Sequence, residues 1–474
     1  MKRFDHRFPV FALILVLAFG LVGCSDDDDS PTMPPAGDQA MLRVVHASPD
    51  APAVDIYVND GTSAVVTALA YGQASAYLDV APGTYSVQIR AHGADASSAP
   101  AYEVDALALT AGQTVTAVAA GLLGSTREDD MFRVLPLVEN FADPGAGNAA
   151  VRIVHASADA PAVAVDVAND GMPEVTGFAR FADTGEAGVA LPAGEAIRIG
   201  VWAGDPLARA ATFTTPSLPA GADLFVIATG LLAGDPASNG FSLLAVGPDG
   251  VVGMIRQDAQ AMVYALHGSP DAPAVDIDAG GVEVVAGLAF GQLSDALTVW
   301  PGAHDLDFRA AGSMTVAASA TTPYLEPGMT YLAIATGFLG GEPAFQLLPV
   351  ADGFAGGDMD ALVRVVHASP DAPAVDVGPV TGDKITAIAD YSGLAFGAAS
   401  PAAGTALPVG ALTVGVAPAG SDTPVATFDV TTATGLRAFA VACGSLGGAG
   451  ESFRLVLVIA GADGWMAAEV MPNP

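Results

Sequence analysis

The sequence predicts an all-β protein built from four tandem β-sandwich domains. The first observation is a phrase, His-Ala-Ser-Pro-Asp-Ala-Pro-Ala-Val-Asp, which runs intact from His46 to Asp55 and again from His367 to Asp376. Variants of the phrase begin at His155 and His267, so it recurs roughly every hundred residues, which is the size of a small domain. The second observation is that each interval holds short apolar runs between Gly- and Pro-rich turns, with no helical period.

The first repeat shows the expected strands in order. Apolar runs at 42–46 and 53–58 flank the phrase, and Asn59-Asp60-Gly61 then marks a tight turn, because Asn and Gly tolerate positive φ. A longer stretch at 65–80 is followed by strand-like runs at 85–89, 115–119 and 132–138, each with counterparts in the other repeats. About seven short strands per hundred residues is typical of an immunoglobulin-like sandwich. An eight-bladed propeller with two blades per repeat is the alternative, although no half-repeat is visible.

Composition shifts divide the chain into segments. The predicted segments are a signal peptide at 1–24, an acidic tether at 25–40, sandwich repeats at 41–142, 148–250, 261–352 and 361–462, and a C-terminal tail at 463–474. The linkers between repeats are short, which indicates a semi-rigid string. Only Cys24 and Cys443 are present, so no disulfide is expected within the processed chain. We expect each repeat to fold alone around its own core.

The first residues have the features of an export signal. Lys2, Arg3 and Arg7 precede an apolar run at 8–19 that is short for a membrane-spanning helix. The run ends in Leu-Val-Gly-Cys24, which resembles the lipobox of bacterial lipoproteins and implies lipidation of Cys24. An ordinary cleaved signal with an incidental cysteine is the alternative.

The segment after Cys24 indicates where the protein resides. Four consecutive aspartates and several prolines follow within residues 25–40, a composition that stays disordered and suits a tether. Ser25, directly after the cysteine, resembles the sorting pattern that favours the outer membrane over the inner one. We therefore expect an exported, membrane-anchored lipoprotein at the outer membrane or cell surface.

The net charge excludes one class of partner. The formal charge is −34 at pH 7, and such a surface repels the phosphate backbone of nucleic acids. The remaining candidate partners are the membrane, reached through the lipid anchor, and an envelope glycan or surface protein. No cofactor is expected, since no Gly-rich loop with lysine, His-Glu-x-x-His or Gly-x-Ser-x-Gly motif occurs.

The candidate site residues are the histidines and aspartates of the repeated phrase. They are His46, Asp50 and Asp55 in repeat 1, His155 and Asp159 in repeat 2, His267, Asp271 and Asp276 in repeat 3, and His367, Asp371 and Asp376 in repeat 4. A histidine with two nearby carboxylates could bind a metal ion or act as a base. We favour a structural role, because each histidine shares a strand face with core residues and a fold determinant must recur in every copy. Repeat 2 has Ala164 in place of the last aspartate.

Two further sets of residues recur at equivalent positions. Arg43, Arg152 and Arg364 lie on the strand face opposite the histidine, with Tyr264 as the counterpart in repeat 3. We interpret them as solvated or partly covered side chains, or as partners of carboxylates across an edge. Cys443 lies on an expected central strand, where a small buried thiol fits.

The phrase resembles the hallmark of the DUF4397 family of bacterial surface domains. The resemblance covers all four repeats and implies tandem β-rich modules on exported proteins, with no established activity. We therefore expect a non-enzymatic, lipid-anchored envelope protein whose modules serve binding, adhesion or spacing. An exported hydrolase acting on glycan or peptide is the alternative, but an enzyme would show one repeat with its own polar cluster.

The lipid anchor can be tested directly. Cys24→Ala removes the thiol that the lipobox resemblance assigns to lipidation, so incorporation of labelled fatty acid should be lost. Membrane fractionation of the variant and the unmodified chain provides the measurement. Equal labelling of both proteins would contradict the assignment.

Overall fold

The computed structural model describes residues 39–357 and 359–474, and this part of the chain is all-β apart from one 3₁₀ turn. The signal peptide, most of the tether and Cys24 lie outside the described residues. Each repeat consists of two hydrogen-bonded sheets that pack face to face, so the prediction of four tandem β-sandwiches is confirmed. The sheets do not form the blades of a propeller.

The strands follow the same order in every repeat. Repeat 1 contains β1 (Ala40–His46), β2 (Val54–Val58), β3 (Val66–Leu69), β4 (Leu78–Val80), β5 (Gly83–Ala91), β6 (Tyr102–Leu109), β7 (Thr114–Ala120) and β8 (Arg133–Val138). Repeat 2 contains β9 (Asn148–His155), β10 (Val163–Val167), β11 (Val175–Phe178), β12 (Val189–Pro192), β13 (Arg198–Ala203), β14 (Ala208–Thr214), β15 (Asp223–Thr229), β16 (Ser242–Gly247) and β17 (Gly250–Arg256).

Repeats 3 and 4 continue the series. Repeat 3 contains β18 (Ala261–His267), β19 (Val275–Ala279), β20 (Val282–Leu288), β21 (Leu297–Val299), β22 (Asp305–Ala310), β23 (Val316–Thr321), β24 (Thr330–Thr336) and β25 (Gln346–Ala351). Repeat 4 contains β26 (Ala361–His367), β27 (Val375–Thr381), β28 (Lys384–Ile385), η1 (Ala389–Tyr391), β29 (Thr405–Leu407), β30 (Gly410–Pro418), β31 (Ala426–Thr432), β32 (Arg437–Cys443), β33 (Arg454–Gly461) and β34 (Gly464–Val470).

The strand that leads into the phrase lies at the centre of one sheet, which we call the phrase sheet. In repeat 1 its order is β4-β1-β7-β8, and β1 pairs with β7 in parallel while all other pairs are antiparallel. The other sheet, here called the outer sheet, has the order β3-β2-β5-β6. The phrase therefore crosses from the phrase sheet to the outer sheet, since it connects β1 to β2.

Several strands were missed in the sequence: β6 and its counterparts β14, β23 and β31 in the outer sheets, and two strands of the phrase sheets. β17 and β34 add a fifth strand to the phrase sheets of repeats 2 and 4. The residues of β17 were expected to belong to a linker, and the segment 463–474, expected as a tail, contains β34. Each of these strands follows a two-residue loop that ends in aspartate, and each begins with glycine, which gives the pairs Asp249-Gly250 and Asp463-Gly464. An Asp-Gly pair between apolar runs is a strong hairpin signal.

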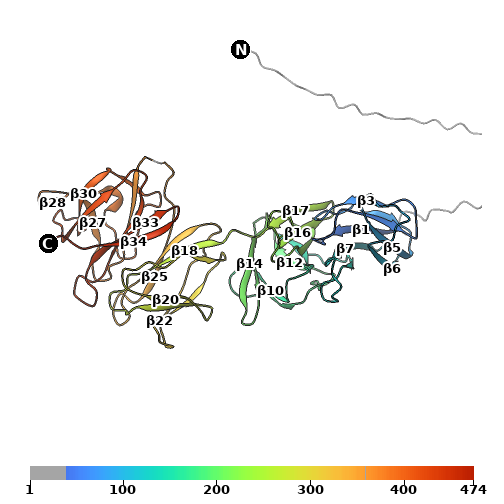
Figure 1. Cartoon of the computed structure of the whole chain (residues 1–474), viewed down its shortest axis with the longest axis horizontal. Helices are drawn as coiled ribbons and strands as arrows, with labels where there is room; N and C mark the ends of the chain where they lie inside the picture. Colours follow the sequence, from blue (N-terminus) through green and yellow to red (C-terminus); the bar gives the residue numbers. More distant parts are fainter. Residues whose placement is uncertain (1–38, 358) are drawn as a thin grey trace, which may run out of the picture.

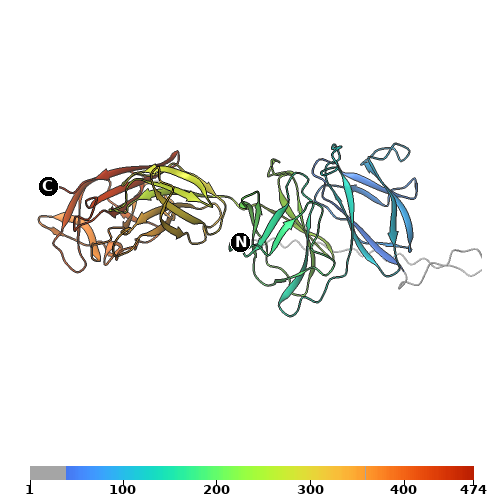
Figure 2. The same cartoon turned by 90° about the horizontal axis from the view of Figure 1, so that it is seen from below.

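The phrase sheets of neighbouring repeats pack against each other. A cluster of buried side chains joins repeats 1 and 2, among them Val45, Val118, Phe225 and Ile227, all fully excluded from solvent. An equivalent cluster joins repeats 3 and 4. The repeats thus form two doublets, a first doublet of repeats 1 and 2 and a second of repeats 3 and 4, which appear as two lobes in Figures 1 and 2. Each phrase sheet is consequently buried on both faces, which explains why its strands are nearly continuous apolar runs.

Arginines cross the doublet interface at equivalent points. Arg43 donates to Gly247 O, Arg152 donates to Val138 O at 2.5 Å, and Arg364 donates to Ala351 O. Each acceptor belongs to the neighbouring repeat and ends an equivalent strand: β16, β8 and β25. All three arginines are buried, so their interpretation as solvated side chains was wrong. The alternative of carboxylate partners is confirmed for two of them, since Arg43 pairs with Glu139 at 3.5 Å and Arg152 with Asp183 at 2.7 Å. In repeat 3, Tyr264 instead stacks on Trp465 of β34, with ring centroids 4.8 Å apart.

A different kind of contact joins the two doublets. Asn169 Nδ2 donates to Pro301 O at 2.9 Å, and Arg198 forms an ion pair with Glu326 at 3.0 Å. The Arg198 guanidinium also lies over the Tyr324 ring, 3.9 Å from its centroid. This junction is mainly polar, whereas the interface inside each doublet is mainly apolar.

The doublet interface can be tested with two matched phenylalanine variants. Phe225→Ala opens a cavity between repeats 1 and 2, so we expect both repeats to lose about 3–5 kcal/mol of unfolding free energy. Hydrogen exchange measured for each repeat in the full chain provides the readout.

The control is Phe213→Ala, since Phe213 is equally buried but lies within the sandwich of repeat 2. It should destabilise repeat 2 more than repeat 1. Loss of protection in repeat 2 alone for both variants would contradict a shared core.

Candidate functional site

The histidine of the phrase lies at the end of its strand and is buried in all four repeats, with 1% of its surface exposed. Its ring nitrogen Nε2 contacts the carbonyl oxygen of the proline six residues later: His46 contacts Pro52 O at 3.1 Å, and the distances in the other repeats are 3.0, 2.9 and 3.0 Å. A carbonyl can only accept, so this nitrogen carries the proton. The imidazole therefore fixes the start of the outer sheet to the end of the phrase strand.

The serine and first aspartate of the phrase bind a second loop. Ser48 Oγ donates to Gly121 O at 2.7 Å, and the Asp50 carboxylate accepts from the N–H groups of Leu123 and Gly124, both at 2.9 Å. Gly121 has φ of +83°, and a Cβ there would lie 2.3 Å from Met131 O, so the position requires glycine. The equivalent serines donate to Gly230, Gly337 and Gly444 at 2.8, 2.7 and 2.6 Å.

The last aspartate of the phrase holds two turns of the outer sheet. Asp55 accepts from Ala68 N at 2.8 Å, His92 Nδ1 at 2.9 Å and Gly93 N at 3.1 Å. Burial opposes its ionisation, but these donors lower the pKa of Asp55 overall. Hydrogen bonds from Gly312 N and Gly287 N likewise lower the pKa of Asp276.

Repeat 4 has the same arrangement of this aspartate, and repeat 2 has an altered one. Asp376 accepts from Gly393 N and Gly420 N, each at 2.7 Å. Repeat 2 lacks this residue, and Asp166 in the same strand instead accepts from Asp170 N, Gly171 N and Trp202 Nε1. A carboxylate therefore holds outer-sheet turns in every repeat, from a shifted position in repeat 2.

These contacts limit the chemistry that the phrase can perform. Burial lowers the pKa of His46, His155, His267 and His367, so each imidazole is neutral near pH 7. The carboxylate oxygens of the phrase aspartates already accept hydrogen bonds from backbone N–H groups. Among the described residues, no group of three or more His, Cys, Asp or Glu side chains is arranged to hold a metal ion.

The second residue of the phrase belongs to the doublet interface. Ala47 O accepts from Thr229 Oγ1 of repeat 2 at 2.7 Å, and Ala368 O accepts from Thr336 Oγ1 of repeat 3 at 2.6 Å. Gly268 replaces this alanine in repeat 3, and a Cβ there would lie 3.5 Å from Cys443 Cβ of repeat 4. Cys443 is fully buried, and burial raises the pKa of its thiol to about 12.

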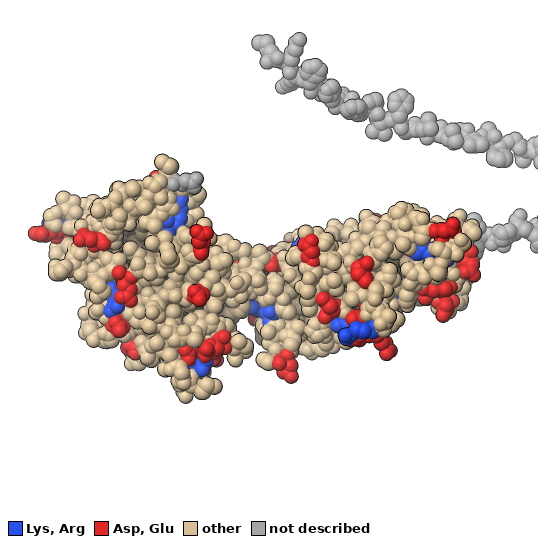
Figure 3. Space-filling model, in the orientation of Figure 1, with Lys and Arg blue, Asp and Glu red and all other residues tan. Residues whose placement is uncertain are grey.

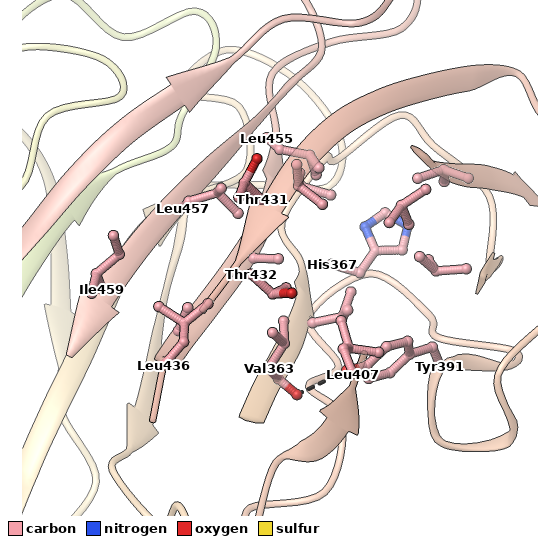
Figure 4. Close-up of a pocket in the computed structure, with 18 of the residues that line it drawn as sticks. Val363, His367, Tyr391, Leu407, Thr431, Thr432, Leu436, Leu455, Leu457 and Ile459 are labelled. Carbon is pink, nitrogen blue, oxygen red and sulfur yellow. Dashed lines mark hydrogen bonds between the residues drawn. The ribbon is translucent and has the colours of Figure 1, made fainter. Parts of the chain in front are cut away.

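The histidine side chain also lies at one end of the apolar interior of its own sandwich. In repeat 4 the interior holds a cavity of about 90 Å³, whose lining includes His367, Val363, Leu407 and Tyr391 (Figure 4). The Tyr391 hydroxyl donates to Val363 O at 2.8 Å. The phrase therefore contacts the sandwich core, the loop beyond the phrase sheet and the neighbouring repeat. The structure brings the predicted histidine and first aspartate of each phrase to one junction, together with the serine between them, which was not predicted as a site residue. The last aspartate lies apart from them, in the turns of the outer sheet.

The fold defines the class of protein: a chain of paired β-sandwiches in which this phrase links the two sheets of each sandwich. The chain belongs to the family described as Domain of unknown function (DUF4397), whose family model matches residues 40–168, 261–378 and 361–460. The search of curated proteins gave no match. Within the described residues, no helix is long and apolar enough to cross a membrane.

Nine chains of solved structures match. One of them is the Bacillus anthracis TIE protein, at 13% sequence identity and a TM-score of 0.14. That alignment covers 63% of this chain and 50% of the TIE chain, so it spans half the length of that protein. A likeness this weak carries no argument about fold or function.

The role of the histidine can be tested in repeat 1. His46→Ala leaves Pro52 O without its donor inside the protein, and we expect repeat 1 to lose about 1–3 kcal/mol of unfolding free energy. Hydrogen exchange resolved by repeat provides the measurement, and repeats 3 and 4 should be unaffected. Stoichiometric metal in the unmodified protein that disappears in His46→Ala would contradict the structural role.

Acid dependence gives a second readout of the same variant. Because burial lowers the pKa of His46 in the folded state, only the unfolded chain takes up the proton as pH falls below about 6.5, and stability decreases. His46→Gln keeps an amide donor but does not titrate. It should lose less stability than His46→Ala at neutral pH and reduce the acid sensitivity of repeat 1.

Proposed function

We propose that the protein is a non-enzymatic, lipid-anchored component of the cell envelope whose four modules act as a semi-rigid spacer. The observation that carries this proposal is the pairing of repeats into doublets with a shared apolar core. Pairing removes the hinge between repeats 1 and 2 and between repeats 3 and 4. The two doublets are arranged end to end (Figure 2), and an elongated shape suits a spacer between the membrane anchor and the far end of the protein.

The contacts of the polar residues that recur in the phrase also favour a structural module. The histidines, serines and aspartates that recur in every repeat bind the protein's own backbone. No repeat concentrates additional buried titratable residues of a kind that a hydrolase would need, as far as the described residues extend. This distribution favours a structural module over the hydrolase alternative.

The surface charge suits an exposed location. Acidic side chains are spread over both doublets, and most of the few basic ones lie beside acidic ones on the face shown in Figure 3. A dispersed negative charge keeps copies of the protein apart and soluble. The anchor at Cys24 and the outer-membrane or surface location remain part of this proposal.

The junction between the doublets decides whether the spacer is stiff. Besides Asn169 and Arg198, Arg209 Nη1 donates to Ala303 O at 3.3 Å, and its guanidinium lies 4.6 Å from the Trp202 ring centroid. Trp300 of repeat 3 packs against the core of repeat 2. Polar contacts supported by one large aromatic residue can hold a preferred angle between the doublets.

The spacer proposal predicts a narrow distance distribution between labels in repeats 2 and 3, measured by electron–electron resonance. Arg198→Ala with Arg209→Ala should broaden that distribution, because both junction guanidiniums are removed. Arg180→Ala is the matched control, since Arg180 contacts Asp129 O and Ala160 O inside the first doublet. A broad distribution in the unmodified protein would sink the proposal of a stiff spacer.

A further inference from the structure

The sandwich interior of repeat 1 differs from those of the other three. Its cavity measures about 410 Å³, compared with about 50 Å³ in repeat 2, 130 Å³ in repeat 3 and 90 Å³ in repeat 4. Natural cores contain few voids larger than a water molecule, and pockets for small ligands begin at about 300 Å³. Only the cavity in repeat 1, among these four, has the size of a ligand site.

The extra space has a cause in the sequence. Repeats 2 and 4 each bury a phenylalanine of the last outer strand, Phe213 of β14 and Phe428 of β31, against the phenylalanine that directly precedes β16 or β33, Phe241 and Phe453. Repeat 3 instead buries Phe308 of the neighbouring outer strand β22 against Phe345, and its cavity is the second largest of the four. Repeat 1 uses Tyr102 on Phe132 instead, with ring centroids 4.8 Å apart.

The strand register shows how the aromatic ring moved. Phe213 pairs with Ile199 and Phe428 with Val414, and the equivalent pair in repeat 1 is Val104 with Val87. Tyr102 occupies the position of Ala211 and Ala426, two residues earlier on the strand. Compared with repeats 2 and 4, the ring has thus shifted by two residues toward one end of the sandwich, and the smaller Val104 occupies the position of their phenylalanines.

The cavity is apolar and reaches the surface at the edges of the sandwich. Its lining includes Val44, Ile56, Val87 and Leu107 from the interior, and Val65, which is 47% exposed beside the edge strand β3. Asp79 of β4, an edge strand of the phrase sheet, is exposed and is the one charged residue in the lining.

We propose that the interior of repeat 1 is a binding site for a single uncharged aliphatic chain, of the kind carried by a medium-chain alcohol or a lipid ester. The volume exceeds that of an engineered cavity of about 150 Å³ that stays dry and binds benzene, and the apolar walls favour hydrocarbon over water. Because the lining supplies no cation and does supply the Asp79 carboxylate, an anionic head group would have no partner and would meet a like charge.

The test uses residues 25–474, which retain every described residue, with 1-decanol and decanoate as the probes. Nuclear magnetic resonance titration should show saturable shifts of signals from the cavity lining with 1-decanol. Decanoate should bind about tenfold more weakly or less, because its carboxylate would be unpaired. The double variant Tyr102→Ala with Val104→Phe reproduces the arrangement of repeats 2 and 4, fills the cavity and should abolish the shifts.

A single variant keeps the test decisive if the double variant does not fold. Val104→Phe leaves Tyr102 in place and puts a ring into the same cavity, so we expect it to weaken 1-decanol binding to repeat 1. Absence of saturable binding to the unmodified chain would overturn the proposal. So would shifts confined to the outer surface, or equal affinity of the folded double variant for 1-decanol.

Discussion

Burial of the phrase sheet on both faces is the constraint on which the rest of the structure depends. One face packs on the outer sheet of the same repeat and the other on the phrase sheet of the neighbour. A parallel pair at the centre of the sheet, such as β1 with β7, is typical of sheets that are covered on both sides. The strands must then be apolar at every position, and any polar group that remains must find a partner inside the doublet. The buried arginines satisfy that requirement by reaching the ends of the neighbour's strands.

The phrase recurs because one short peptide meets several of these requirements at once. Its histidine, serine and aspartate hold the two loops at the end of the phrase sheet. In repeats 1 and 4 the backbone of its second residue also accepts a hydrogen bond from the neighbouring repeat. Substitutions are tolerated where they match across the interface. Gly268 faces Cys443 in the second doublet, so the smallest residue at the second position of the phrase lies against the cysteine of the neighbouring repeat.

The sandwich repeats could be predicted from the sequence because the phrase and the turns recur at fixed positions. The doublets could not be predicted, because a strand buried on both faces gives a continuous apolar run that does not identify what covers each face. The buried arginines were misread for the same reason, since a cation next to an apolar strand looks exposed until its partner strand is known. β17 and β34 carried an Asp-Gly hairpin signal that was read as a linker and a tail.

The two fifth strands show that odd and even repeats are not interchangeable. β17 brings Met254 to the shared core of the first doublet, and β34 brings Trp465 to that of the second. A Cβ on Gly72 of repeat 1 would lie 2.9 Å from the Met254 methyl group, so the turn after β3 is matched to the strand that covers it. Repeats 2 and 4 therefore complete the cover of repeats 1 and 3, and the structural period of this chain is the doublet, which is twice the period visible in its sequence.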